Sequence, residues 1–142
     1  MATRREQILT TWEAALQGLP TTSGRIWRSR VEPLQRHESP GVVIEWDTDT
    51  PSSTSSNLTY MDRSLAARTV IVTRDNRPDS VADPIVAQIH QLTIASTALR
   101  ALLIDLMPGQ IRCELLQADS PAALVTMDWA FTYRTSYGSQ EA

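Results

Sequence analysis

The feature that most constrains the fold is an alternating stretch late in the chain, LVTMDWAFTYRT (Leu124–Thr135). Every second residue in it is apolar or aromatic: Val125, Met127, Trp129, Phe131 and Tyr133. The residues between them are mostly polar, and a period of two residues is typical of a β-strand. The stretch therefore predicts a strand that packs one face into a core and turns a mostly polar face away from it.

Residues 3–17 have the spacing of a helix instead. Apolar side chains recur there every three or four positions, which places them on one stripe of a helix. They are Ile8, Leu9, Trp12, Ala15 and Leu16, followed by Leu19. Thr3 and Glu6 fit a capping box at the start. A helix with one apolar face is therefore expected at this end of the chain.

A second helix is predicted over residues 80–96. Ser80 and Asp83 are candidate caps, and Pro84 then falls in the first helical turn, where proline is tolerated. Residues 98–109, ALRALLIDLMPG, fit either a short helix or an irregular apolar segment that ends at Pro108-Gly109.

Four more segments predict strands, over residues 25–31, 42–47, 60–75 and 110–119. Ser and Thr dominate residues 47–57, which predicts a flexible loop or an extended hairpin. Residues 138–142 are expected to form a disordered tail. Strands that come in groups between two helices predict one α+β domain over residues 1–142. Its sheet is expected to be mainly antiparallel or mixed, with the two main helices packed on one face.

Composition limits the classes of function. The 142 residues are 42% hydrophobic and 20% charged, with a net charge of -3, which is typical of a soluble globular chain. A general nucleic-acid-binding protein would need a basic surface stripe, and none is evident. The amino-terminal residues lack the apolar core of a signal peptide, so an intracellular protein without a membrane anchor is expected.

The residue types that carry catalysis are sparse and scattered. His37 and His90 lie far apart, and neither has a partner at metal-ligand spacing. The single cysteine, Cys113, lies in the alternating stretch QIRCELL, which predicts a small buried apolar residue more than a nucleophile. The five glycines are isolated, so no phosphate-binding loop is formed. The sequence predicts no catalytic, cofactor or metal site.

The acidic run EWDTD is the most suggestive polar feature. Glu45, Asp47 and Asp49 share one strand parity, with side chains about 7 Å apart. Three interpretations are open: a cation site, an electronegative surface that DNA slides past, or a solvated strand face. Arg28 and Arg30 on the preceding predicted strand are candidates for cross-strand ion pairs with these carboxylates.

Tryptophan is abundant for a chain of this size, with four residues. Core packing is the default for each, but tryptophan is also enriched where proteins bind one another. Trp27 and Trp46 are the candidates for exposure, because both lie on strands that lead into open loops.

The order of these segments resembles a known family. The amino-terminal helix precedes GLPTTSGRIWRSRVEPL and SPGVVIEWDTD, followed by RSLAARTVIVTRD, the helix in DSVADPIVAQIHQL, and LVTMDWAFTYRT. This layout is similar to the minor tail protein U-like tail terminators of long-tailed bacteriophages, whose last strand also ends in a Y.T pattern, here in Phe131–Thr135. The resemblance extends from about Ile8 to Tyr137 and rests on order and spacing.

The resemblance implies a structural function without cofactors. Tail terminators form a ring, usually of six subunits, that caps the tail tube, stops its growth and offers a surface for head attachment. The implied partners are copies of the chain itself, the tail tube protein and a head-completion or connector protein. DNA passes through the ring without specific binding. The implied location is the head-proximal end of the virion tail, and the host cytoplasm during assembly.

Within this hypothesis, one group of residues is expected to contact neighbouring subunits or the tube: Trp27, Arg28, Arg30, Trp46, Thr132 and Arg134. A second group is expected to face the channel: Glu45, Asp47, Asp49 and Asp128. Three alternatives are open. The first is another head–tail connector or tail tube protein of the virion, the second is a small enzyme or ligand-binding domain, and the third is a nucleic-acid-binding module.

Overall fold

A five-stranded sheet organises the molecule. The computed structural model describes residues 2–20, 22, 25–30, 33–34, 38–52, 58–117 and 121–141. The elements are α1 (Arg4–Leu16), β1 (Ile26–Arg28), β2 (Gly41–Pro51), β3 (Tyr60–Arg74), α2 (Pro78–Ala95), α3 (Thr97–Arg100), β4 (Asp105–Gln117) and β5 (Pro121–Ser136). The α+β prediction is confirmed.

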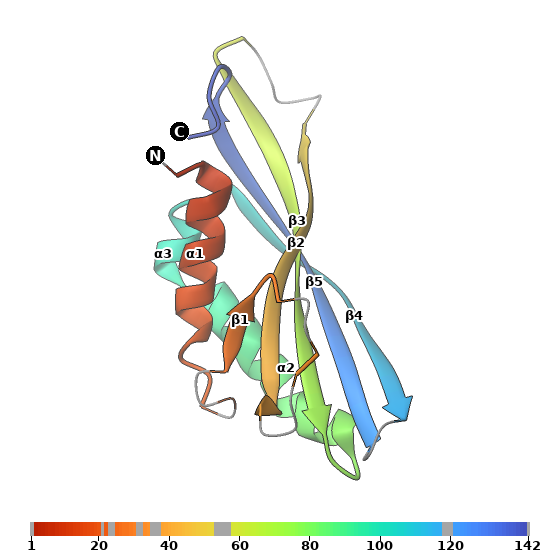
Figure 1. Ribbon diagram of the computed structural model, residues 1–142. Helices are drawn as coiled ribbons and strands as arrows, with labels where there is room; N and C mark the ends of the chain where they lie inside the picture. The colour runs from red at the N-terminus through yellow and green to blue at the C-terminus, as the bar shows by residue number, and fades with distance from the viewer. Residues whose placement is uncertain are drawn as a thin grey trace.

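The strands follow the order β1-β2-β3-β5-β4, so the last strand in sequence lies inside the sheet. Only β1 and β2 are parallel, and the other three pairs are antiparallel. Figure 1 shows the helices on one side of a long, twisted sheet. The sheet therefore has a face covered by helices, called the helix side below, and an opposite helix-free face.

The alternation in β5 has the predicted effect. All five apolar residues of the pattern, from Val125 to Tyr133, are at most 5% exposed, and they lie on the helix side. β5 pairs with β3 in continuous register from Tyr60↔Ser136 to Arg74↔Ala122. Because β4 pairs with its other edge, β5 contributes to two ladders and one core face at once.

Helix α1 begins and packs as its sequence predicts. The Thr3 hydroxyl accepts a hydrogen bond from the Glu6 amide at 3.1 Å, which caps the first turn. Trp12 lies at the centre of the buried stripe, 5.0 Å from Phe131 and 6.1 Å from Trp129 between ring centroids, in edge-to-face geometry. Its indole Nε1 donates to the hydroxyl of Thr93 on α2 at 3.0 Å, so one side chain joins both main helices to β5.

Helix α2 begins earlier than predicted. Its first residue is Pro78, and neither Ser80 nor Asp83 caps it, while Pro84 lies inside the helix. Proline suits the first helical position because it lacks an N–H that would have no helical partner there. The Pro78 carbonyl accepts a hydrogen bond from the Thr73 hydroxyl at 2.7 Å, which ties the turn after β3 to the start of the helix.

Two strands are longer than predicted. β2 continues to Pro51 and pairs with β3, so residues 47–51 follow the extended-hairpin alternative of the prediction, while 53–57 lie outside the described residues. β4 begins at Asp105 and continues through Pro108-Gly109, where its register against β5 shifts. Proline and a bulge are tolerated there because β4 is an edge strand.

The carboxyl-terminal segment lies against the start of α1. The Arg4 amide donates to the Gln140 carbonyl at 2.7 Å. Figure 1 places the two ends of the chain close together. Residues 138–141, expected to be a free tail, are therefore joined to the folded domain by at least this hydrogen bond.

The buried Trp12–Thr93 hydrogen bond gives the first prediction. Thr93→Val should lower the free energy of unfolding by about 1–3 kcal/mol, because the buried indole N–H then lacks its acceptor. Trp12→Phe combined with Thr93→Val should cost less than the sum of the two single changes. Urea unfolding measures both quantities. Thr10→Val, on the exposed side of α1, is the matched control, and strictly additive costs would contradict the coupling.

Candidate functional site

The most buried charged cluster centres on Asp49, whose side chain is only 4% exposed. Its carboxylate accepts hydrogen bonds from Arg5 of α1 at 3.0 Å and from Arg63 of β3 at 2.9 Å, and a third from the Tyr133 hydroxyl of β5. Four elements that are distant in sequence therefore meet at one carboxylate. Charge-assisted hydrogen bonds of this kind fix geometry strongly.

Tyr133 is held in its neutral form in this cluster. Burial raises the pKa of its phenol far above the ordinary value of 10.0, and the hydrogen bond to Asp49 raises it further. A neutral phenol can donate to the carboxylate, whereas a phenolate beside it would repel it. The cluster is thus a polar clamp between α1 and the sheet.

A β-bulge in β2 separates the acidic residues that were expected to share a face. Trp46 lies opposite Ala67 and Thr48 lies opposite Ala66, so Asp47 is the extra residue. A bulge shifts the alternation of all later side chains. Asp49 consequently points to the helix side and Glu45 to the helix-free face. The predicted single face of three carboxylates is wrong, and Asp49 does not belong to an exposed surface.

The helix-free face carries cross-strand ion pairs. Arg134 donates to Asp62 at 2.6 Å, Arg68 to Glu45 at 2.7 Å and Arg112 to Asp128 at 3.3 Å. The Arg68–Glu45 and Arg112–Asp128 pairs are about one-third exposed or more and contribute little stability each, whereas the Asp62 carboxylate is only 9% exposed. Their main effect is to balance the sign of charge along this face. Of the residues expected to face a channel, Glu45 and Asp128 belong to these pairs.

The predicted pairing of Arg28 and Arg30 with the acidic run is wrong. Arg28 donates to both carboxylate oxygens of Glu6, at 2.8 and 2.6 Å, and this contact lowers the pKa of the Glu6 carboxyl. Arg30 donates to Glu38 in the same bidentate way, at 2.9 and 2.8 Å. Ser29 between them has a φ of 57°, a left-handed conformation that ends β1 and its alternation. Both arginines therefore hold contacts within the chain.

The two candidate exposed tryptophans differ. Trp27 is partly covered, because the Arg30 guanidinium lies 4.6 Å from its ring centroid. Trp46 is 41% exposed, with the Arg5 guanidinium 4.7 Å from its ring. Trp46 therefore has the exposure that the sequence predicted, and its place in an interface stays a prediction.

The structure adds a surface that sequence reasoning missed, the open edge of β4. Nearly every residue of this 13-residue strand is exposed, including four of its five large apolar side chains. These are Met107, Ile111, Leu115 and Leu116. Cys113 is exposed as well, so its predicted burial is wrong. An exposed apolar edge strand can pair with a strand of another chain, and monomeric proteins usually cover or interrupt such edges.

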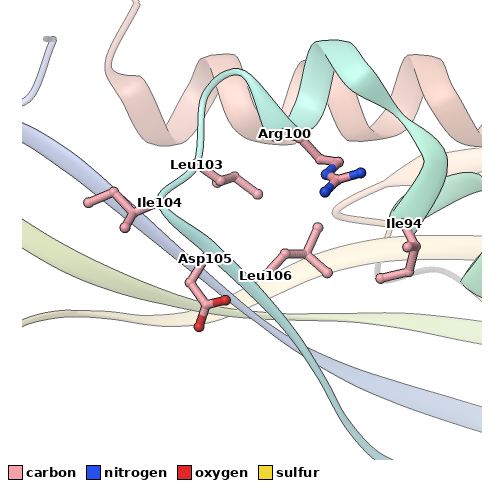
Figure 2. A pocket seen from close by; sticks show the side chains of 6 residues that line it. All are labelled: Ile94, Arg100, Leu103, Ile104, Asp105 and Leu106. Carbon is pink, nitrogen blue, oxygen red and sulfur yellow. The ribbon is translucent and has the colours of Figure 1, made fainter.

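Figure 2 shows a small cavity of about 340 Å³ between α3, the end of α2 and the start of β4. Its lining consists of Ile94, Arg100, Leu103, Ile104, Asp105 and Leu106. In the figure the Arg100 and Asp105 side chains point in different directions, and the other four are apolar. His90 lies elsewhere, on the exposed side of α2 with its ring 6.0 Å from that of Trp129. His37 lies outside the described residues.

Neither a metal centre nor a membrane span emerges from the described part of the chain. Groups of three or more His, Cys, Asp or Glu side chains placed to hold a metal ion are not found among the described residues. No helix of that same part is long and apolar enough to cross a membrane. The sequence matches no protein-family model and no curated protein.

The Asp49 cluster predicts a strong stability effect. Asp49→Asn should lower the free energy of unfolding by about 1.5–3 kcal/mol at neutral pH, because two arginines lose a charged acceptor. Asp128→Asn, which removes only an exposed ion pair, is the matched control and should change it by less than about 0.5 kcal/mol. Chemical denaturation of both variants tests this. Equal effects would contradict the clamp.

The raised pKa of Tyr133 predicts a loss of stability in alkali. The unfolded phenol ionises near its ordinary pKa of 10.0, while the folded phenol keeps its proton to higher pH. Its contribution is therefore complete below pH 10 and is lost as pH rises above that value. Tyr133→Phe should flatten the fall in unfolding free energy between pH 9 and pH 11, measured at several pH values. An unchanged slope would contradict this.

Proposed function

We propose that the protein is a tail terminator of a long-tailed bacteriophage. It forms a ring, expected to have six subunits, that caps the tail tube, ends tube growth and presents a surface for head attachment. Its partners are further copies of itself, the tube protein and a head-completion protein, and its mature location is the head-proximal end of the tail. Binding between matched surfaces performs this function, without a chemical step or a cofactor.

The observation that carries the proposal is the order of the folded elements. The resemblance requires an amino-terminal helix, an extended strand, a helix that opens with aspartate and a final aromatic strand. These correspond to α1, β3, α2 with Asp79 in its first turn, and β5. In the folded chain these four elements contribute most of the buried core, together with residues of β1, β2 and α3, and this supports the proposal.

The helix-free face supports a position next to a DNA passage. DNA must move past such a surface, and a strong basic field would bind its phosphates. Of the arginines on this face, Arg68, Arg112 and Arg134 are each paired with a carboxylate, and Arg74 donates to the Leu34 carbonyl. In this proposal Glu45, Asp47 and Asp128 remain channel-facing candidates, while the buried Asp49 does not.

The interface candidates change in a similar way. Trp46 is exposed and keeps its predicted role, together with Thr132 and Arg134 on the outward parity of β5. Arg28, Arg30 and Trp27 hold α1 and the segment after β1 through contacts within the chain. Changing them would disturb the subunit itself, so they are poor probes of assembly.

Electron microscopy of the purified protein, alone and mixed with tail tubes, tests the proposal. A terminator should form single rings and should be found at one end of each tube. A tube protein would instead polymerise alone into long tubes, because each of its rings can bind a further ring. Long tubes from the protein alone, or no association with tubes, would contradict the terminator function.

Trp46 provides a sharper version of this test. Trp46→Ala should weaken ring formation or tube capping by at least about 2 kcal/mol if the indole is a central contact, equivalent to roughly thirtyfold in affinity. Leu58→Ala is the matched control, because Leu58 is 85% exposed and was not assigned to an interface. Equal capping by both variants at limiting protein concentration would remove Trp46 from the interface.

A further inference from the structure

The open edge of β4 has the pattern of a strand that pairs with another strand. Within the described residues β4 has a neighbour, β5, on one side only, and its register is regular from Ile111 to Gln117. The backbone N–H and C=O groups directed away from β5 are then available to an added strand. A strand is the partner that would satisfy the whole row.

Between Ile111 and Leu115, apolar and charged side chains of β4 lie on opposite faces of the sheet. Ile111, Cys113 and Leu115 lie opposite Met127, Val125 and Ala123, all of which are buried on the helix side. The intervening Arg112 and Glu114 belong to the helix-free face. Yet Ile111 is 54% exposed and Leu115 67%, so the helices that bury β5 leave the apolar row of β4 open.

We propose that a second copy of this chain covers the edge, with the two β4 strands antiparallel about a two-fold axis centred on Cys113. Antiparallel pairing around this centre places Arg112 opposite Glu114 of the other copy, and Glu114 opposite its Arg112. Ile111 then meets Leu115 on the helix side, also twice. The contact is isologous, so every favourable pair occurs two times.

Charge selects this register over its neighbours. Pairing centred on Arg112 would place two arginines directly opposite one another, and pairing centred on Glu114 would oppose two glutamates. Like charges at opposed positions disfavour a strand pair, and opposite charges favour it. A shift of one residue in only one strand would instead turn the apolar row of that strand to the other face. Among these alternatives, only the register centred on Cys113 places apolar residues opposite apolar residues and opposite charges opposite each other.

The proposal concerns self-association of the free protein and does not rest on the tail function. The Arg112 side chain is 52% exposed despite its ion pair with Asp128 of β5, so its guanidinium is accessible to a second copy. In the proposed dimer the two sheets would join into one sheet of ten strands, with the helices of both copies on the same side.

Disulfide trapping tests the register. Cα atoms of directly opposed residues are about 4.5–5.5 Å apart in antiparallel strands, within the range that a disulfide spans. Because Cys113 is the single cysteine, diamide should rapidly convert the wild-type chain to a covalent dimer that dithiothreitol reverses. The combined variant Cys113→Ser with Leu58→Cys moves the thiol to an exposed site off β4 and reports random collision. Equal crosslinking rates for the two proteins would overturn the proposal.

Charge reversal tests the contact without using the thiol. Arg112→Glu and Glu114→Arg should each weaken the dimer, with Kd raised on the order of tenfold or more, because two attractive pairs become repulsive. The double variant should restore it, and an equimolar mixture of the two single variants should form heterodimers. Sedimentation velocity over a range of concentrations measures these states. Single variants that dimerise like wild type, or a double variant that stays as weak as the singles, would overturn the proposal.

The apolar row has its own control pair. Leu115→Lys should abolish the dimer, since the lysine would meet Ile111 of the second copy, while Leu58→Lys should leave it intact. Both positions are highly exposed, so circular dichroism should show a fold like that of wild type in each variant. A wild-type chain that stays monomeric at every concentration tested would also overturn the proposal.

Discussion

The packing of Trp12 against β5 is the interaction on which the rest of the structure depends. The indole touches Trp129 and Phe131 through its ring and Thr93 through its N–H, so α1, α2 and β5 are fixed to one another at a single point. The Asp49 clamp fixes the same helix to β2, β3 and β5 farther along the sheet. With the helix side held at both places, the helix-free face and the β4 edge are left as the outward surfaces.

The core could be predicted from the sequence because its signals are local. Alternation identified the buried face of β5, and helical spacing identified the buried stripe around Trp12. In both segments the repeat of apolar residues along the chain shows which side chains are buried. The pairing of Arg28 with Glu6 could not be predicted in this way. It depends on where α1 crosses β1, which is set by tertiary packing and not by the spacing of either segment.

The surface was harder to predict for two physical reasons. One extra residue at Asp47 inverts the alternation of β2, and nothing in the letters EWDTD distinguishes a bulge from a continuous strand. In β4, the alternation around Cys113 predicts a half-buried strand. Its apolar side would be buried only if a helix lay over it, and Cys113 is exposed. Whether a helix reaches an edge strand depends on the position of α2 across the sheet. Assembly surfaces are therefore the part of this chain that periodicity describes least well.

The place of β5 in the sheet also affects how the protein is made. β5 follows every other element along the chain, yet it lies between β3 and β4 and carries most of the aromatic core. A ribosome must therefore synthesise the chain through Ser136 before either ladder of β5, or the packing of Trp12, can form. Until then β4 lacks its partner and the helices have no aromatic face to cover, so nascent chains cannot present a finished assembly surface. Because this late, long-range pairing leaves apolar strands without partners during synthesis, the chain is open to association until β5 is in place.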